Sequence, residues 1–173
     1  TDADNLLLRL SEQPVLNHSA ENLLKELSGQ CFDKLIVVDA SASQEIAALY
    51  EQFLAKGIAI VTPNKLANSA GIERFANLKQ LANKQLTPYL YETTVAAALP
   101  IIKPLLDLRR AGDKPIRIEA VLSGTIAYVM DRIQQNIAFT KAIEEAVALG
   151  YAEPDPLQDL SGEDVARKIL ILL

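Results

Sequence analysis

The chain has 173 residues, half of them hydrophobic, a net charge of −5, one histidine and one cysteine. No basic run suggests nucleic acid, no apolar run reaches the roughly 18 residues of a membrane span, and zinc bound by nitrogen and sulfur is excluded by the single His and Cys. The lone Cys31 also rules out an internal disulfide and fits a cytoplasmic location.

Strands and helices are expected to alternate through the first half of the chain. The predicted strands are 34–39, 58–62 and 87–92, and the predicted helices are 20–27, 44–56 and 70–84. The first strand is a β-branched run of the type buried in parallel sheets, and Gly57 ends the helix that follows it. A strand, a helix and a second strand within about thirty residues form a βαβ unit, which requires parallel pairing. This favours an α/β fold.

The second half changes character. We expect a long helix over 96–110, interrupted at Pro100 and Pro104, and then a half-exposed strand at 116–121, where apolar and polar residues alternate. Further helices are predicted at 126–135, at 140–149 with Thr140 as cap, and after Ser161. A domain junction is placed near Ala96. The predicted domains are therefore 1–95 and 96–173.

Two loops follow predicted parallel strands, at 39–43 and 62–65, and ligands of open α/β sheets bind at such ends. Lys65 therefore either meets a phosphate, a carboxylate or a reacting oxygen, or is a solvated loop lysine. Ser41 and Ser43 are favoured as helix caps. No three of the seven glycines fit G-x-G-x-x-G, so the chain either binds no dinucleotide or lacks the first half of such a domain.

The segment 150–168 carries the densest set of polar groups. Pro154 and Pro156 stiffen a turn that bears carboxylates, and Ser161 is predicted to cap the next helix. Asp164 and Lys168, four residues apart, share one face of that helix. The pair is either an ordinary surface ion pair or an acid and an amine at a site. The apolar residues that follow favour a buried helix, in which desolvation tunes the charge of a lysine.

Five segments together resemble the homoserine dehydrogenase family: 38–43, 61–65, 91–100, 122–125 and 150–168. The resemblance covers roughly residues 30–173. It implies that the chain is a fragment, truncated at both ends, of an NADP- or NAD-dependent enzyme. Residues 1–95 would then be the second half of a Rossmann-like nucleotide-binding domain, and residues 96–173 part of an α+β substrate and dimerisation domain. The implied enzyme interconverts aspartate 4-semialdehyde and L-homoserine in threonine and methionine biosynthesis. The fragment alone is expected to be inactive, because half of the phosphate cradle is missing.

The resemblance also implies roles for individual residues. Lys168 matches the proton donor, Lys65 matches a second lysine at the junction of cofactor and substrate, and Asp164 matches a ligand of the reacting end of the substrate. The remaining implied positions are substrate-binding Glu153 and Asp159, cofactor-binding Ser41, and a monovalent-cation site (Na⁺ or K⁺) at Glu92, Val95, Ala97 and Leu99.

Two departures from the family pattern accompany these matches. Alanines at 96–98 replace the usual glycines near the cation site, which predicts a reshaped loop, since alanine resists positive φ. Gln158 replaces a carboxylate near the substrate. Two alternatives stay open: a non-catalytic assembly or regulatory module with the same fold, and another amino-acid-pathway dehydrogenase. The implied partners are a small-molecule substrate, a second copy of the chain in a homodimer or larger assembly, and a fused aspartokinase.

Overall fold

The computed structural model describes residues 20–28, 34–152 and 160–173. The chain divides into two compact units, residues 1–33 and 34–173. In the first unit the predicted N-terminal helix is present as α2 (Ala20–Ser28). No helix in the described ranges is long and apolar enough to cross a membrane.

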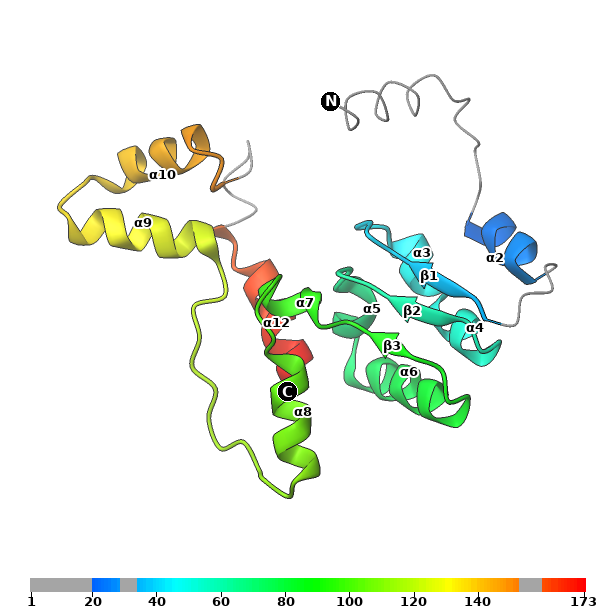
Figure 1. Ribbon diagram of the computed structural model, residues 1–173. Helices are drawn as coiled ribbons and strands as arrows, with labels where there is room; N and C mark the ends of the chain where they lie inside the picture. Colours follow the sequence, from blue (N-terminus) through cyan, green and yellow to red (C-terminus); the bar gives the residue numbers. More distant parts are fainter. Residues whose placement is uncertain (1–19, 29–33, 153–159) are drawn as a thin grey trace, which may run out of the picture. The chain divides into compact units, whose positions relative to one another are not determined.

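The second unit is built on a three-stranded parallel sheet, as predicted (Figure 1). Its strands are β1 (Ile36–Val38), β2 (Ala59–Val61) and β3 (Tyr89–Leu90), in the order β1-β2-β3. Val37 pairs with Ile60, and Ile60 pairs with Tyr89, so these three side chains lie in one row on the same face of the sheet.

Four helices connect these strands. They are α3 (Gln44–Ala48), α4 (Tyr50–Ala55), α5 (Leu66–Ser69) and α6 (Ile72–Lys84). The predicted single helix over 44–56 is interrupted at Leu49, and Gly57 ends it with φ +75°, as expected of a terminating glycine. The short α5 was not predicted. It turns the chain directly after the loop that carries Lys65.

The two faces of the sheet are unequally covered at β1. On one face, Ile60 is fully buried against the core that also holds Tyr50, Phe53 and Leu78. Ile36 and Val38, on the opposite face, are 61% and 69% exposed. The expected burial of this strand was therefore wrong for Ile36 and Val38, which no described element of residues 34–173 covers.

The helices with described bounds after the sheet are α7 (Thr93–Ala96), α8 (Ile102–Arg110), α9 (Gly124–Gln134), α10 (Phe139–Ala148) and α12 (Glu163–Leu172). The predicted helix over 96–110 begins only at Ile102, and Pro104 lies in its first turn, where a missing N–H costs little. The predicted strand at 116–121 was wrong. This exposed segment pairs with no strand of the described chain, and a strand needs a hydrogen-bonding neighbour.

The predictions for the helix ends were only partly correct. Ser123 caps α9 by accepting a hydrogen bond from the Ile126 N–H, and α10 and α9 share a small core of Val129, Ala142, Ala146 and Ala152. Thr140 is not a cap, because α10 already begins at Phe139. Gly162, with φ +74°, takes the cap position of α12 that was predicted for Ser161.

The expected burial of the whole α12 helix was also wrong. Of its apolar residues, Ile171 is buried, whereas Ile169 and Leu170 are about half exposed.

Candidate active site

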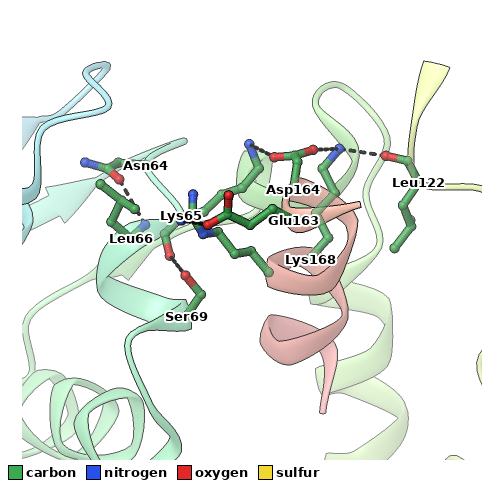
Figure 2. Close-up of polar contacts among 9 residues, drawn as sticks. Asn64, Lys65, Leu66, Ser69, Leu122, Glu163, Asp164 and Lys168 are labelled. Carbon is green, nitrogen blue, oxygen red and sulfur yellow. Dashed lines mark hydrogen bonds and ion pairs between the residues drawn. The ribbon is translucent and has the colours of Figure 1, made fainter. Parts of the chain in front are cut away.

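Lys65 is held at the carboxyl end of β2 by a tightly bonded loop. The Asn64 side-chain oxygen accepts a hydrogen bond from the Leu66 N–H at 3.0 Å, and the Lys65 carbonyl accepts from the Ser69 hydroxyl at 2.9 Å and the Ser69 N–H at 3.0 Å. These bonds fix the backbone on both sides of the lysine, while its side chain stays 29% exposed. The amine therefore projects from a rigid support toward α12 (Figure 2).

Asp164 lies between two lysines from distant parts of the sequence (Figure 2). Its Oδ1 is 3.1 Å from the Lys65 Nζ and its Oδ2 is 2.7 Å from the Lys168 Nζ. The second contact confirms that Asp164 and Lys168 share one helix face. The first is a long-range contact, which the sequence spacing alone does not reveal. We call these three residues the charged triad.

Lys168 is the more enclosed of the two lysines. Its side chain is 15% exposed, and its amine donates a hydrogen bond to the Leu122 carbonyl at 2.7 Å. Leu122 belongs to one of the family-like segments, but it carried no predicted role. The amine thus has a charged acceptor on its own helix and a neutral one on the chain before α9, which limits its orientation.

The two lysines set the charge state of Asp164. Its partial burial acts to raise the pKa, but hydrogen bonds and charge from Lys168 and Lys65 outweigh this effect and hold the pKa below its usual value. The carboxylate is therefore ionised at neutral pH and keeps two ammonium groups together. Such an arrangement can polarise a carbonyl oxygen and deliver a proton to it.

A polar cluster, buried except at Ser41, underlies the two strand-end loops. It consists of Asp39, Ser41, Tyr50, Thr62 and Asn64, and we call it the Asp39 cluster. Asp39, 4% exposed, accepts hydrogen bonds from the Ser41 N–H (2.8 Å) and hydroxyl (2.6 Å), the Tyr50 hydroxyl (2.6 Å) and the Asn64 amide (3.1 Å). Burial acts to raise the pKa of Asp39, but these four bonds outweigh it, so the pKa is lowered.

The two loop serines have separate roles in this arrangement. Ser43 caps α3 by accepting from the Ile46 N–H at 3.3 Å, as favoured from the sequence. Ser41 is not a helix cap. Its hydroxyl donates to Asp39 and accepts from the Ser43 N–H at 3.1 Å. One acceptor lone pair of the exposed Ser41 hydroxyl therefore remains for a donor group on a ligand.

The loop predicted to hold a cation has a specific geometry. The Glu92 carboxylate accepts hydrogen bonds from the N–H groups of Ile101 (2.6 Å), Ile102 (2.7 Å) and Lys103 (2.8 Å), so it caps the N-terminus of α8. Ala97 takes φ +49° and ψ −107° despite its Cβ. Ala97 therefore adopts a positive φ, although alanine was expected to avoid this conformation. Any cation here would have to use mainly backbone carbonyl oxygens, which suit hard cations.

We expect Ala97→Gly to raise the free energy of unfolding by about 1 kcal/mol. The relief of backbone strain, roughly 1–3 kcal/mol, exceeds the cost of the greater freedom of glycine in the unfolded chain, about 0.4–1 kcal/mol. Urea titration would measure the change. Ala98→Gly is the matched control, because Ala98 is not among the positive-φ residues. It should lower stability slightly. Equal shifts for both variants would contradict the strain at Ala97.

Several predicted site residues cannot be placed. Glu153, Asp159 and Gln158 lie outside the described residues. Sequence reasoning also gave no role to Tyr50 or to Asn64. A usable signal was present, because Asp39 and Asn64 both follow strands of one parallel sheet and must meet at the same edge.

A parallel βαβ sheet with Ser41 and Lys65 past its strand ends is the arrangement of a Rossmann-like fold, in which ligands bind at the carboxyl ends of the strands. The family sequence model "Homoserine dehydrogenase" matches residues 100–173, and that of the "Homoserine dehydrogenase, NAD binding domain" matches residues 2–92. The chain belongs to the homoserine dehydrogenase family.

Individual relatives agree with this assignment. A bifunctional aspartokinase/homoserine dehydrogenase of Daucus carota is 42% identical over 153 residues, which cover 88% of this chain and 17% of the relative. The bifunctional aspartokinase/homoserine dehydrogenase 2 of Escherichia coli (strain K12) is 33% identical over 171 residues, 99% of this chain and 21% of the relative. A solved hyperthermophilic archaeal homoserine dehydrogenase in complex with NADPH has a TM-score of 0.75 at 32% identity, with 93% of this chain and 48% of that one covered. The chain thus spans only part of each relative.

Proposed function

We propose that this chain supplies the central part of a homoserine dehydrogenase, which interconverts aspartate 4-semialdehyde and L-homoserine with NADP(H) or NAD(H). The observation that carries the proposal is the charged triad. It joins Lys65, at the nucleotide-binding sheet, to Asp164 and Lys168 on α12. Lys65 lies within the residues matched by the NAD-binding domain and α12 within those matched by the second family model, which supports a site between cofactor and substrate.

The reaction needs a hydride and a proton. When bound, the nicotinamide cofactor supplies the hydride. In the direction of reduction, Lys168 gives a proton to the oxygen that was the aldehyde carbonyl, while Lys65 polarises the same oxygen. Asp164 holds both amines and limits their mutual repulsion. In the direction of oxidation, Lys168 takes the hydroxyl proton back.

The remaining implied residues complete the substrate and cofactor contacts. The carboxylates of Glu153 and Asp159 are proposed to bind the polar groups of homoserine, including its amino group. The remaining acceptor lone pair on Ser41 suits a hydroxyl or amide N–H of a nucleotide cofactor, and residues 40–42 are exposed at that edge. A monovalent cation at the carbonyl oxygens around Ala97 would brace the loop between β3 and α8.

The wider organisation follows the family resemblance. We propose that residues 1–95 belong to the nucleotide-binding part and residues 96–173 to the substrate part. Ile116 and Ile118, which are 99% and 42% exposed, with Ala120 are proposed to contribute to an interface between two copies. Fusion to an aspartokinase is supported by the names of the Daucus carota and Escherichia coli relatives. A cytoplasmic location stays a prediction, and the Daucus carota relative is described as chloroplastic.

The test is NAD(P)H oxidation with aspartate 4-semialdehyde, using the protein at its full natural length. We expect the full-length protein to convert the semialdehyde to homoserine, with turnover measured as the loss of absorbance of the reduced cofactor. Succinic semialdehyde, which lacks the amino group, serves as the substrate control and should react poorly. A well-folded full-length protein without turnover would favour the non-catalytic module. Equal use of both aldehydes would favour a different dehydrogenase.

A further inference from the structure

Two loops near the proposed reaction site share one buried anchor. The first, 39–43, follows β1 and carries Ser41, and the second, 62–65, follows β2 and carries Lys65. Asn64 joins them, because its amide nitrogen donates to the Asp39 carboxylate at 3.1 Å and to the Ser43 carbonyl at 3.0 Å. The Asn64 side-chain oxygen, in turn, holds the Leu66 N–H directly after Lys65.

The Tyr50 hydroxyl links the two loops on the buried side of this junction. Its hydroxyl lies 2.6 Å from the Asp39 Oδ2 and 2.8 Å from the Thr62 Oγ1, and its side chain is fully buried. The Thr62 hydroxyl donates to the Asp39 carbonyl at 3.0 Å and accepts from the Asn64 N–H at 2.8 Å. Thus one phenol in α4 contacts side chains at the ends of both strands.

We propose that Tyr50, through Asp39 and Asn64, is a positioning residue that fixes the Lys65 loop so that the Lys65 amine meets Asp164. This inference rests on the proposed function for its catalytic consequence, but the structural coupling can be tested without it. Tyr50 itself does not touch the charged triad. Its effect is transmitted by the backbone of residues 62–65, which is bonded on both sides of the lysine.

The first experiment measures amide hydrogen exchange in the full-length protein and in Tyr50→Phe. The phenylalanine ring keeps the apolar packing and removes only the hydroxyl. Reporter amides are those of Ser41, Asn64 and Leu66, which donate to atoms of the Asp39 cluster. We expect protection to fall about tenfold in both loops, while the amides of α9 are unchanged. Tyr91→Phe is the control, since Tyr91 is buried in the same core and outside the cluster. Unchanged protection in Tyr50→Phe overturns the coupling.

The second experiment is a double-mutant cycle of Tyr50→Phe and Lys65→Ala, with kcat and KM measured for aspartate 4-semialdehyde. Tyr50→Phe alone should lower kcat about tenfold, since small misplacement of a catalytic group is costly. In the Lys65→Ala background the same change should lower kcat less than about twofold, because it acts through Lys65. An equal factor in both backgrounds would show a general structural effect and overturn the inference. Loss of loop protection in a protein that never turns over would refute the proposed function but leave the coupling intact.

Discussion

Lys168→Ala in the full-length protein is expected to lower kcat by roughly 10²–10⁴, the usual contribution of a general acid. The lysine is held between the Asp164 carboxylate and the Leu122 carbonyl, so its ammonium proton has a defined direction. Without it, the developing alkoxide has no positioned donor and must take its proton from water. Steady-state kinetics of semialdehyde reduction would measure the loss, with little change expected in the dissociation constant of the cofactor.

Lys103 offers a matched control for that variant. It also pairs with an aspartate four residues away, since its Nζ is 2.6 Å from the Asp107 Oδ2, but its side chain is 75% exposed on α8. Lys103→Ala should leave kcat within about twofold, because an exposed ion pair contributes little. If folded Lys168→Ala turned over at a near-normal rate, Lys168 would not be the proton donor.

Asp164→Asn is expected to lower kcat/KM by about 10²-fold. The amide keeps the shape of the side chain but no longer neutralises Lys65 and Lys168, so the two amines repel and lose their common acceptor. Since the lysines hold the pKa of Asp164 below its usual 3.8, the native carboxylate loses its charge only as pH falls below that value. The ratio of variant to native kcat/KM should therefore stay constant from pH 5 to pH 8, roughly, in a pH-rate series.

Asp107→Asn is the corresponding control for a carboxylate between two cations. Asp107 contacts Lys103 and Arg110 on the exposed side of α8. Its loss should leave kcat/KM within about twofold. A defect in Asp164→Asn that disappears toward pH 8 would contradict the assigned charge state of Asp164.

Local patterns in the sequence were sufficient to predict the βαβ unit and one contact of the candidate site. The β-branched runs at 36–38 and 59–61, with Gly57 before the second, set the strands and their parallel order. The four-residue spacing of Asp164 and Lys168 set their contact, because it follows from helix geometry alone.

Contacts between distant segments could not be read from the same patterns. The Lys65–Asp164 ion pair joins residues about a hundred positions apart, and the packing of α12 against α5 and α7 brings them together. The exposed apolar residues of β1 and α12 show a second limit of prediction from the sequence. Hydrophobic composition predicts which faces seek a partner, but it does not say whether the described chain contains that partner.

The acceptor that Lys168 uses on Leu122 is a main-chain oxygen. Every amino acid, proline included, brings a carbonyl to that position, so the contact depends on the path of the backbone and not on the side chain. Position 122 is therefore open to sequence drift among residues that keep the local conformation, whereas position 168 is not. Mutational tolerance near the proposed proton donor thus need not follow distance from it, because a residue that bonds the lysine through its backbone can vary as long as the local conformation is kept.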